Sequence, residues 1–117
     1  MMKKVFVYGT LMSGERASGM LDRGSFLGEY TLNGYTTYDL GPFPGIKEDK
    51  EGEVLGELYY IPDSLIQSLD SYEGEGGLYK RTLVTVRNAQ SVVNDVFVYV
   101  YLGSVSDCAR VLGRWAS

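Results

Sequence analysis

The 117-residue sequence contains no histidine and only one cysteine, Cys108. Without histidine the chain cannot form a Ser-His or Cys-His nucleophilic pair, and it lacks a ligand found in most zinc sites. A single cysteine cannot form an internal disulfide, which is typical of a protein from a reducing compartment. With no histidine to activate it, Cys108 is expected to be inert. Any catalysis must therefore use carboxylates, hydroxyls, amines and backbone groups.

Long apolar runs and clusters of basic residues are also lacking. No apolar run approaches the ~18–20 residues that cross a bilayer, and no basic block is longer than Lys3-Lys4 or Lys80-Arg81. With a formal net charge of −4, the chain is not expected to bind nucleic acid or a membrane. Met1 leads into a short predicted strand without a cleavage-like segment, so we expect a cytoplasmic protein.

The composition that remains is that of an ordinary globular protein. Hydrophobic residues make up 44% of the chain and charged residues 22%, which argues against disorder. A chain of 117 residues is long enough for one hydrophobic core and too short for two. We therefore expect a single domain over residues 1–117.

The pattern of apolar residues, glycines and prolines predicts strands and short helices. Strands are predicted at residues 4–8, 25–40, 54–61, 80–87 and 94–102. Because Gly28 and Gly34 interrupt it, the second of these is either two strands or one strongly bent strand. Helices are predicted at residues 14–21, from Pro62 to Gly74, and after Ser106; residues 41–45 are predicted to form a loop and the charged residues 47–53 a surface turn. This order predicts an α+β fold with a mixed, curved sheet and two or three short helices, in which only the first strand–helix–strand section resembles a parallel crossover.

Glu73 lies at the predicted C-terminal end of the helix that begins near Pro62. The negative end of the helix dipole disfavours a charged carboxylate by ~0.3–1 kcal/mol, and burial beside an aromatic ring such as that of Tyr72 raises the pKa further. Such a carboxylate can shuttle protons near neutral pH. The alternative is a solvated residue at a helix end, which the residues alone favour.

The first predicted strand leaves through Tyr8-Gly9-Thr10-Leu11. A strand followed by Gly and Thr can turn successive backbone N–H groups into one concavity, which binds carboxylates or a developing oxyanion. The alternative is a plain strand-to-helix turn in which Gly9 permits the bend and Thr10 acts as a cap. Taken alone, a tetrapeptide favours that alternative.

Five short segments follow one another along the sequence, and together they are more informative than any one alone. They are Tyr8-Gly9-Thr10-Leu11 with Gly14, Gly41-Pro42-Phe43-Pro44-Gly45, Val54-Leu55-Gly56-Glu57-Leu58-Tyr59, Leu69-Asp70-Ser71-Tyr72-Glu73-Gly74 and Tyr79-Lys80-Arg81. In these segments the chain resembles the γ-glutamylcyclotransferase-like family, which also includes γ-glutamylamine cyclotransferases. The resemblance runs from about Val5 to Leu102.

The resemblance implies a small fold built around a barrel-like sheet with one cavity. It implies that Glu73 is the catalytic acid and base, that the backbone of Tyr8, Gly9, Thr10 and Leu11 cradles a γ-glutamyl group, and that Tyr79 lines the pocket. The implied substrate is a small γ-glutamyl amine or peptide, and neither a metal nor an organic cofactor is implied. The substrate's own α-amine attacks its γ-carbonyl, which yields 5-oxoproline and a free amine. The enzyme then supplies no nucleophile, which suits a chain without histidine.

The sequence departs from the family after Leu11. Many relatives have asparagine and histidine there, whereas this chain reads Gly14-Glu15-Arg16-Ala17-Ser18. The leaving group is therefore left open, as is the oligomeric state. Glutathione fragments, γ-glutamyl-lysine crosslinks and acylated biosynthetic intermediates all share the reacting half.

Other roles stay open beside the catalytic one. The same fold could serve as a non-catalytic module that binds a carboxylate or a γ-glutamyl group, since a fold does not fix an activity; a purely structural or protein-interaction role is a third possibility. Asp70 is either a surface carboxylate or a supporting partner of the site. Arg81 either pairs with a substrate carboxylate or is an exposed strand residue. Glu75-Gly76-Gly77 is either a mobile lid or a loop.

Overall fold

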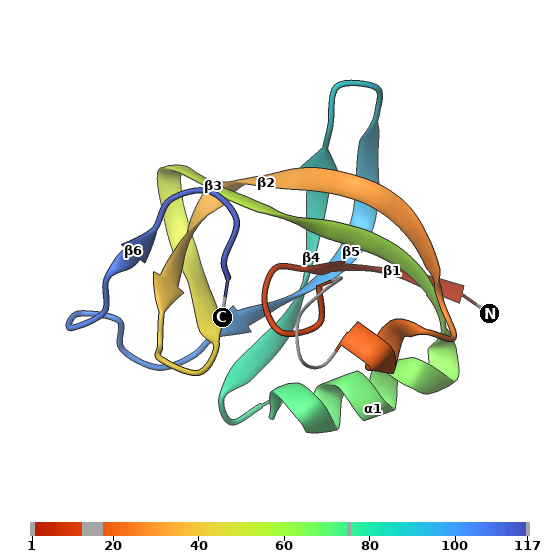
Figure 1. Ribbon diagram of the computed structural model, residues 1–117, viewed down its shortest axis with the longest axis horizontal. Helices are drawn as coiled ribbons and strands as arrows, with labels where there is room; N and C mark the ends of the chain where they lie inside the picture. The colour runs from red at the N-terminus through yellow and green to blue at the C-terminus, as the bar shows by residue number, and fades with distance from the viewer. Residues whose placement is uncertain (1, 13–17, 75, 117) are drawn as a thin grey trace.

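The computed structural model describes residues 2–12, 18–74 and 76–116 of the chain. Within them lie six strands, one α-helix and one short 3-10 helix (Figure 1). These are β1 (Met2–Val7), η1 (Ser18–Leu21), β2 (Ser25–Asp39), β3 (Pro44–Pro62), α1 (Asp63–Glu73), β4 (Tyr79–Arg87), β5 (Val92–Tyr101) and β6 (Arg110–Val111). The predicted α+β fold with a mixed, curved sheet is confirmed.

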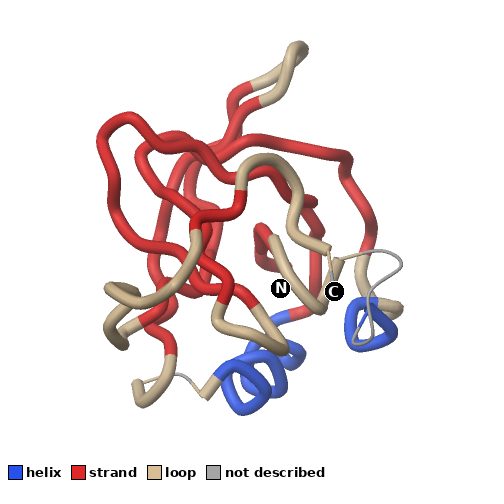
Figure 2. Tube along the Cα trace, turned by 60° about the vertical axis from the view of Figure 1, so that its left-hand side comes forward, coloured by secondary structure: helices blue, strands red, loops and turns tan. Residues whose placement is uncertain are grey.

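The strands form one sheet that closes on itself. Their order is β3-β1-β5-β4-β2-β6, and β2 also pairs with β3, so that five strands complete a ring. Figure 2 shows the strands wrapped around a common centre, with the helical segments below them. The described parallel pair joins β1 to β5, whereas β1 and β2 are not neighbours. The predicted parallel crossover between the first two strands is therefore wrong, because β3 and β5 occupy both edges of β1.

Alternation along β1 divides the hydrophobic core in two. Phe6 belongs to the cluster inside the ring, to which all five ring strands contribute. Val5 and Val7 point the other way, into a second cluster that includes Leu65, Ile66 and Leu69 of α1. The first strand is thus covered on both sides, which accounts for its continuous apolar run. Its C-terminal end opens between the two clusters, which is where the candidate site lies.

The strand β2 bends at glycines. Gly28 has φ 132° and Gly34 has φ 89°, a backbone conformation that glycine adopts without strain. The register with β3 shifts at both places, between Phe26 and Gly28 and between Asn33 and Tyr35. Residues 25–39 therefore form one strongly bent strand, the second of the two predicted alternatives.

Three predicted segments differ from the structure. Residues 47–53 are part of β3, so the predicted surface turn is wrong; their charge reflects an exposed strand, in which residues 49–52 stand opposite Gly34 alone. The segment after Ser106 forms turns and β6, which pairs with β2, so the predicted helix is wrong. Of the predicted helix at 14–21, residues 14–17 lie outside the described part and 18–21 form η1. The predicted loop at 41–45 is shorter, because β3 already begins at Pro44.

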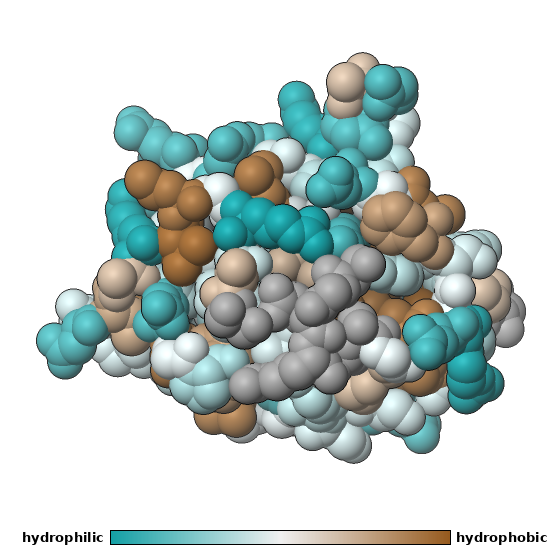
Figure 3. Space-filling model, viewed as in Figure 1, coloured by the Kyte–Doolittle hydropathy of each residue, from teal (hydrophilic) through white to brown (hydrophobic). Residues whose placement is uncertain are grey.

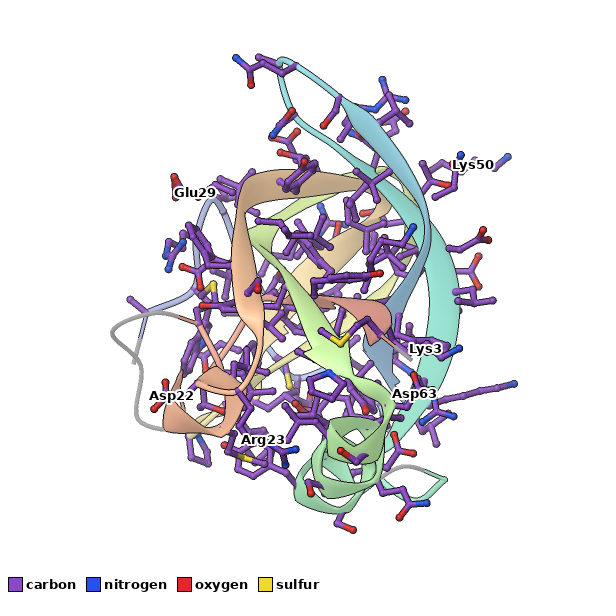
Figure 4. The ribbon with its side chains drawn as sticks, turned by 90° about the vertical axis from the view of Figure 1, so that its right-hand side faces the viewer. Lys3, Asp22, Arg23, Glu29, Lys50 and Asp63 are labelled. Carbon is purple, nitrogen blue, oxygen red and sulfur yellow. The ribbon has the colours of Figure 1, made fainter. Side chains whose placement is uncertain are left out.

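Charged residues lie on the outside of this fold. Figure 4 shows Glu29 and Lys50 projecting outward at the end of the molecule remote from α1. The face in Figure 3 mixes hydrophilic and hydrophobic residues in small areas rather than in one broad apolar band. Among the described residues, no helix has the length and apolar character needed to cross a membrane.

Candidate active site

A pocket lies where the C-terminal end of β1 meets α1. It is lined by residues from the loop after β1, the start of β3, the end of α1, and strands β4 and β5. All six residues predicted for the site are among its lining residues, namely Tyr8, Gly9, Thr10, Leu11, Glu73 and Tyr79. These positions are up to 71 residues apart in the sequence, so the closed sheet is what brings them together.

The pocket has an inner hollow and an outer groove. The inner hollow, lined by the loop after β1 and by Glu73, has a cavity volume of about 20 Å³, room for about one water-sized group. The outer groove has about 200 Å³ and is lined by Thr10, Phe43, Tyr72, Glu73, Leu78 and Tyr79. Four of these residues, Thr10, Phe43, Glu73 and Tyr79, line both parts. The carboxylate of Glu73 thus lies at the junction.

The end of α1 positions Glu73. Pro62 starts the helix, and Gly74 ends it in the left-handed conformation with φ 67°, as predicted from the sequence. This stop makes Glu73 the last helical residue and leaves its side chain partly buried against the pocket. Glu73 is therefore a pocket-lining carboxylate, and the alternative of a solvated helix-end residue is excluded.

Burial raises the pKa of the Glu73 carboxyl from 4.5 to about 7. The cause is loss of hydration, which penalises the charged form. In the described part of the chain, no hydrogen bond or ion pair offsets this penalty. A carboxyl group with a pKa near neutrality can both accept and return a proton under physiological conditions.

The loop after β1 is held from three sides. The Tyr8 hydroxyl donates a hydrogen bond of 2.6 Å to the carbonyl of Tyr99, and burial raises the pKa of Tyr8 well above its usual value. The Met12 N–H donates to the Gly9 carbonyl at 3.0 Å, which closes a tight turn. Leu11 is only 2% exposed and packs in the cluster beneath α1. The backbone predicted to cradle a ligand is therefore fixed in place.

Gly9 is required by a close approach. A Cβ atom at Gly9 would lie 2.8 Å from the ring carbons of Pro44, which is closer than real Cβ contacts allow. Absence of a side chain thus lets the loop after β1 touch the start of β3. Among the described residues, the Thr10 hydroxyl shares a hydrogen bond of 2.5 Å with the Tyr72 hydroxyl at the end of α1.

Tyr79 connects the start of β4 to the start of β3. Its hydroxyl donates to the carbonyl of Pro44 at 2.6 Å, and its ring packs against Phe43 and Tyr101 at centroid distances of 6.4 and 5.6 Å. Burial raises the pKa of Tyr79 well above its usual range, and the negative charge of the nearby Glu73 raises it more. Tyr79 is therefore a neutral hydrogen-bond donor that shapes the pocket wall.

Asp70 supports the site from behind. It lies three residues before Glu73 and accepts a hydrogen bond of 2.6 Å from the Tyr99 hydroxyl. Its other oxygen pairs with Arg81 at 2.5 Å, and the Arg81 guanidinium also lies 4.8 Å from the centre of the Phe97 ring. Asp70 is thus a supporting carboxylate, and Arg81 is a strand residue paired with it.

Phe43 and Tyr99 line the pocket, but the sequence did not single them out as site residues. Phe43 sits in the Gly-Pro-Phe-Pro-Gly segment, whose two prolines signalled a rigid loop and could have marked it. Tyr99 is one of ten tyrosines, most of which suit strands, so no local signal distinguishes it. Across the described residues, no group of three or more acidic, cysteine or histidine side chains is arranged to hold a metal ion.

Comparisons with known proteins agree with this architecture. The family model described as "Gamma-glutamyl cyclotransferase, AIG2-like" matches residues 5–117. The γ-glutamylcyclotransferase family protein YtfP of Citrobacter rodentium is 32% identical over 113 residues, which cover 96% of this chain and 94% of that protein.

Two solved structures share the fold. The YtfP protein of Escherichia coli is 30% identical with a TM-score of 0.72, over 92% of this chain and 90% of that one. An AIG2-like protein from Mus musculus is 26% identical with a TM-score of 0.79, over 91% and 81%. By sequence and by fold, the chain belongs to the AIG2-like γ-glutamyl cyclotransferase family.

Proposed function

We propose that this protein is a cyclotransferase that converts a γ-glutamyl amine or peptide into 5-oxoproline and a free amine, with Glu73 as general acid and base. The observation that carries the proposal is the partly buried carboxyl of Glu73, which has no hydrogen-bond or ion-pair partner among the described residues. It lines the pocket together with the loop after β1 and has a pKa of about 7. Family membership supports the same chemistry.

The reaction begins when the Glu73 carboxylate removes a proton from the substrate's α-ammonium group. Such a group has a pKa of about 7.7–8.0 in model peptides, close enough to that of Glu73 for efficient transfer. The freed amine attacks the γ-carbonyl carbon and closes a five-membered ring. The amide C–N bond then breaks as the protonated Glu73 gives its proton to the departing nitrogen. The regenerated carboxylate removes the surplus proton from the new ring nitrogen and passes it to the released amine, which leaves in its ammonium form. The products are 5-oxoproline and the amine, and Glu73 is again a carboxylate.

The protein contributes mainly orientation and charge stabilisation. Holding the α-amine against the γ-carbonyl within one molecule can lower the barrier by ~7–11 kcal/mol. Backbone N–H groups of Gly9, Thr10 and Leu11 are the candidate donors to the oxyanion, a type of contact whose loss costs ~3–4 kcal/mol. A γ-glutamyl group exceeds the inner hollow, whose cavity volume is about 20 Å³, so the lining side chains must move apart when substrate enters.

The substitution Glu73→Gln tests the proposal. It keeps the shape of the side chain and removes the proton shuttle, so we expect kcat to fall about 100-fold or more. Formation of 5-oxoproline from a panel of γ-glutamyl compounds, followed by mass spectrometry, is the measurement. The matched control is Glu51→Gln, which makes the same change at an exposed position of β3 outside the pocket.

The outcomes of this experiment distinguish the proposed function from its alternatives. A Glu73→Gln variant as active as the unmodified protein would defeat the assignment of Glu73. Free glutamate in place of 5-oxoproline would indicate a hydrolase. Binding of γ-glutamyl compounds with no product at all would indicate a binding module.

A further inference from the structure

The outer groove of the pocket indicates which amine is released. We propose that the leaving amine carries an uncharged, apolar substituent, such as an aryl or branched alkyl group, which lies in the outer groove. This inference rests on the proposed function, since it assigns the half of the substrate that the cyclisation discards. The inner hollow adjoins the loop after β1, so the γ-glutamyl half is assigned to it, and the bond that breaks lies near Glu73, where the two parts meet.

Apart from the Glu73 carboxyl, the polar side-chain atoms of the described groove residues are already paired with each other or with the backbone. The hydroxyls of Thr10 and Tyr72 share a hydrogen bond of 2.5 Å, and the Tyr79 hydroxyl donates to the Pro44 carbonyl at 2.6 Å. A polar substituent would have to compete with these bonds, and a buried polar group without a partner costs binding free energy. Apart from Glu73, the described groove therefore presents mainly carbon atoms to a bound substituent.

Those carbon atoms form a surface suited to an apolar group. Leu78 is 50% exposed and Tyr72 42% exposed at the rim. Phe43 and Tyr79 form the wall where the groove joins the hollow, with ring centroids 6.4 Å apart. A ring or branched chain placed between these side chains would remove apolar surface from water on both partners, which is favourable.

The charges around the groove disfavour an acidic leaving group. Among the described residues that line the groove, Glu73 is the charged one. Of the nearby described cations, Arg81 pairs with Asp70, and Lys47 lies 5.5 Å from the centre of the Tyr101 ring; neither lines the groove. The carboxylate of an amino-acid or dipeptide leaving group would thus meet the negative charge of Glu73. A cationic substituent would pair with Glu73 and lower the pKa that proton transfer requires.

Binding to the Glu73→Gln variant tests the inference without turnover. The probes are γ-glutamyl-benzylamide, γ-glutamyl-glycine and a cationic γ-glutamyl-aminobutylamine, each titrated by calorimetry. Because the variant carries no charge at position 73, the binding ratio reports the apolar surface of the groove alone, and we expect the benzylamide to bind about tenfold or more tightly than either charged probe. The additional substitution Leu78→Lys should reduce that preference, because it replaces exposed groove carbon with a cation. Leu83→Lys, at a residue 57% exposed on β4 outside the groove, is the matched control and should leave the preference unchanged.

The outcomes separate this inference from the proposed function. Equal binding of the three probes, tighter binding of a charged probe, or no detectable binding of the benzylamide would overturn the apolar assignment. A preference that Leu78→Lys leaves intact would overturn the placement in the outer groove. Absence of 5-oxoproline from every probe with the unmodified protein would instead defeat the cyclotransferase proposal, while the binding ratios would still report on the groove.

Discussion

Two buried glutamates of this molecule have opposite surroundings. Glu57 on β3 is 3% exposed, yet its oxygens accept hydrogen bonds from the Tyr59 hydroxyl at 2.9 Å and from Arg114 at 2.5 Å. Glu73 is less deeply buried and has no such partner in the described part of the chain. Burial alone therefore does not make a carboxyl group reactive. A buried carboxylate that lacks hydrogen-bond donors is destabilised in its charged form, and this raises its pKa.

The partners of Glu57 give it a structural role. Arg114 precedes Trp115, which is 4% exposed and packs in the same cluster as Leu11 and the apolar face of α1. The Glu57–Arg114 pair thus fastens the C-terminal segment over the outside of β3. In the described part of the chain, by contrast, no partner offsets the cost of burying the Glu73 carboxylate, a pattern common at active sites.

The largest expected effect on stability comes from breaking the pair at Glu57. Arg114→Ala leaves a buried carboxylate with fewer donors, so the free energy of unfolding should fall by about 1–3 kcal/mol. At a temperature well below the transition, kcat should stay unchanged, because Arg114 lies outside the pocket. Urea unfolding of Arg114→Ala beside Arg87→Ala, an exposed arginine on β4, gives the comparison. Equal stability of the two variants would remove the structural role assigned to Glu57.

The second expected effect is a pH dependence of stability that originates at Glu73. Its pKa is about 7 in the folded protein against 4.5 for an ordinary glutamate. The folded state holds the proton more tightly, so this contribution to stability is fully present below pH 4.5 and is lost as pH rises to about 7 and beyond. After allowance for the partial exposure of Glu73, the free energy of unfolding should fall by about 2 kcal/mol over this pH range.

Comparison with Glu73→Gln isolates that loss. The variant cannot ionise at this position, so its stability relative to the unmodified protein should increase by about 2 kcal/mol between pH 4.5 and 7.5. Urea midpoints measured for both proteins across this range are sufficient. Parallel curves would show that the carboxyl of Glu73 titrates normally, which would weaken the contrast with Glu57.

The sequence singled out one of these glutamates and not the other: local signals placed Glu73 at a helix end, and only the family resemblance placed it in a pocket. Glu73 follows a proline-started apolar helix and precedes a helix-ending glycine, and these are local signals. Glu57 alternates with Gly56 and Leu58 on β3 and resembles any solvent-facing strand residue. Its partner Arg114 is 57 residues away, in a segment that was predicted to be helical. Pairings between distant segments depend on the closed sheet, and neither composition nor periodicity contains that information.

The same reasoning explains which parts of the fold were predictable. The bend of β2 and the limits of α1 follow from single glycines and a proline, whose backbone preferences act locally. The charged residues 47–53 were misread because surface charge is shared by turns and exposed strands. Their assignment to β3 depends on pairing with β2 across the bulge at Gly34.

The smallest expected effect concerns Asp70, which is intermediate between the two glutamates: it is partly exposed, paired with Arg81 and hydrogen-bonded to Tyr99. Asp70→Asn weakens these contacts, and since they fix α1 one turn before Glu73, kcat should fall about three- to tenfold with little change in KM. The apparent pKa of Glu73 in the pH dependence of the rate should also shift, because a displaced α1 changes how deeply the Glu73 carboxyl is buried.

A double-mutant cycle distinguishes positioning from simple loss of stability. Tyr99→Phe removes the hydroxyl that donates to Asp70, so it should lower kcat to a similar extent, and the double variant should be little worse than either single one. Effects that add fully would mean that the two residues act separately. An unchanged pH profile in Asp70→Asn would mean that Asp70 holds the helix without tuning the carboxyl of Glu73, and the distinction between supporting and reacting carboxylates would then rest on Glu57 and Glu73 alone.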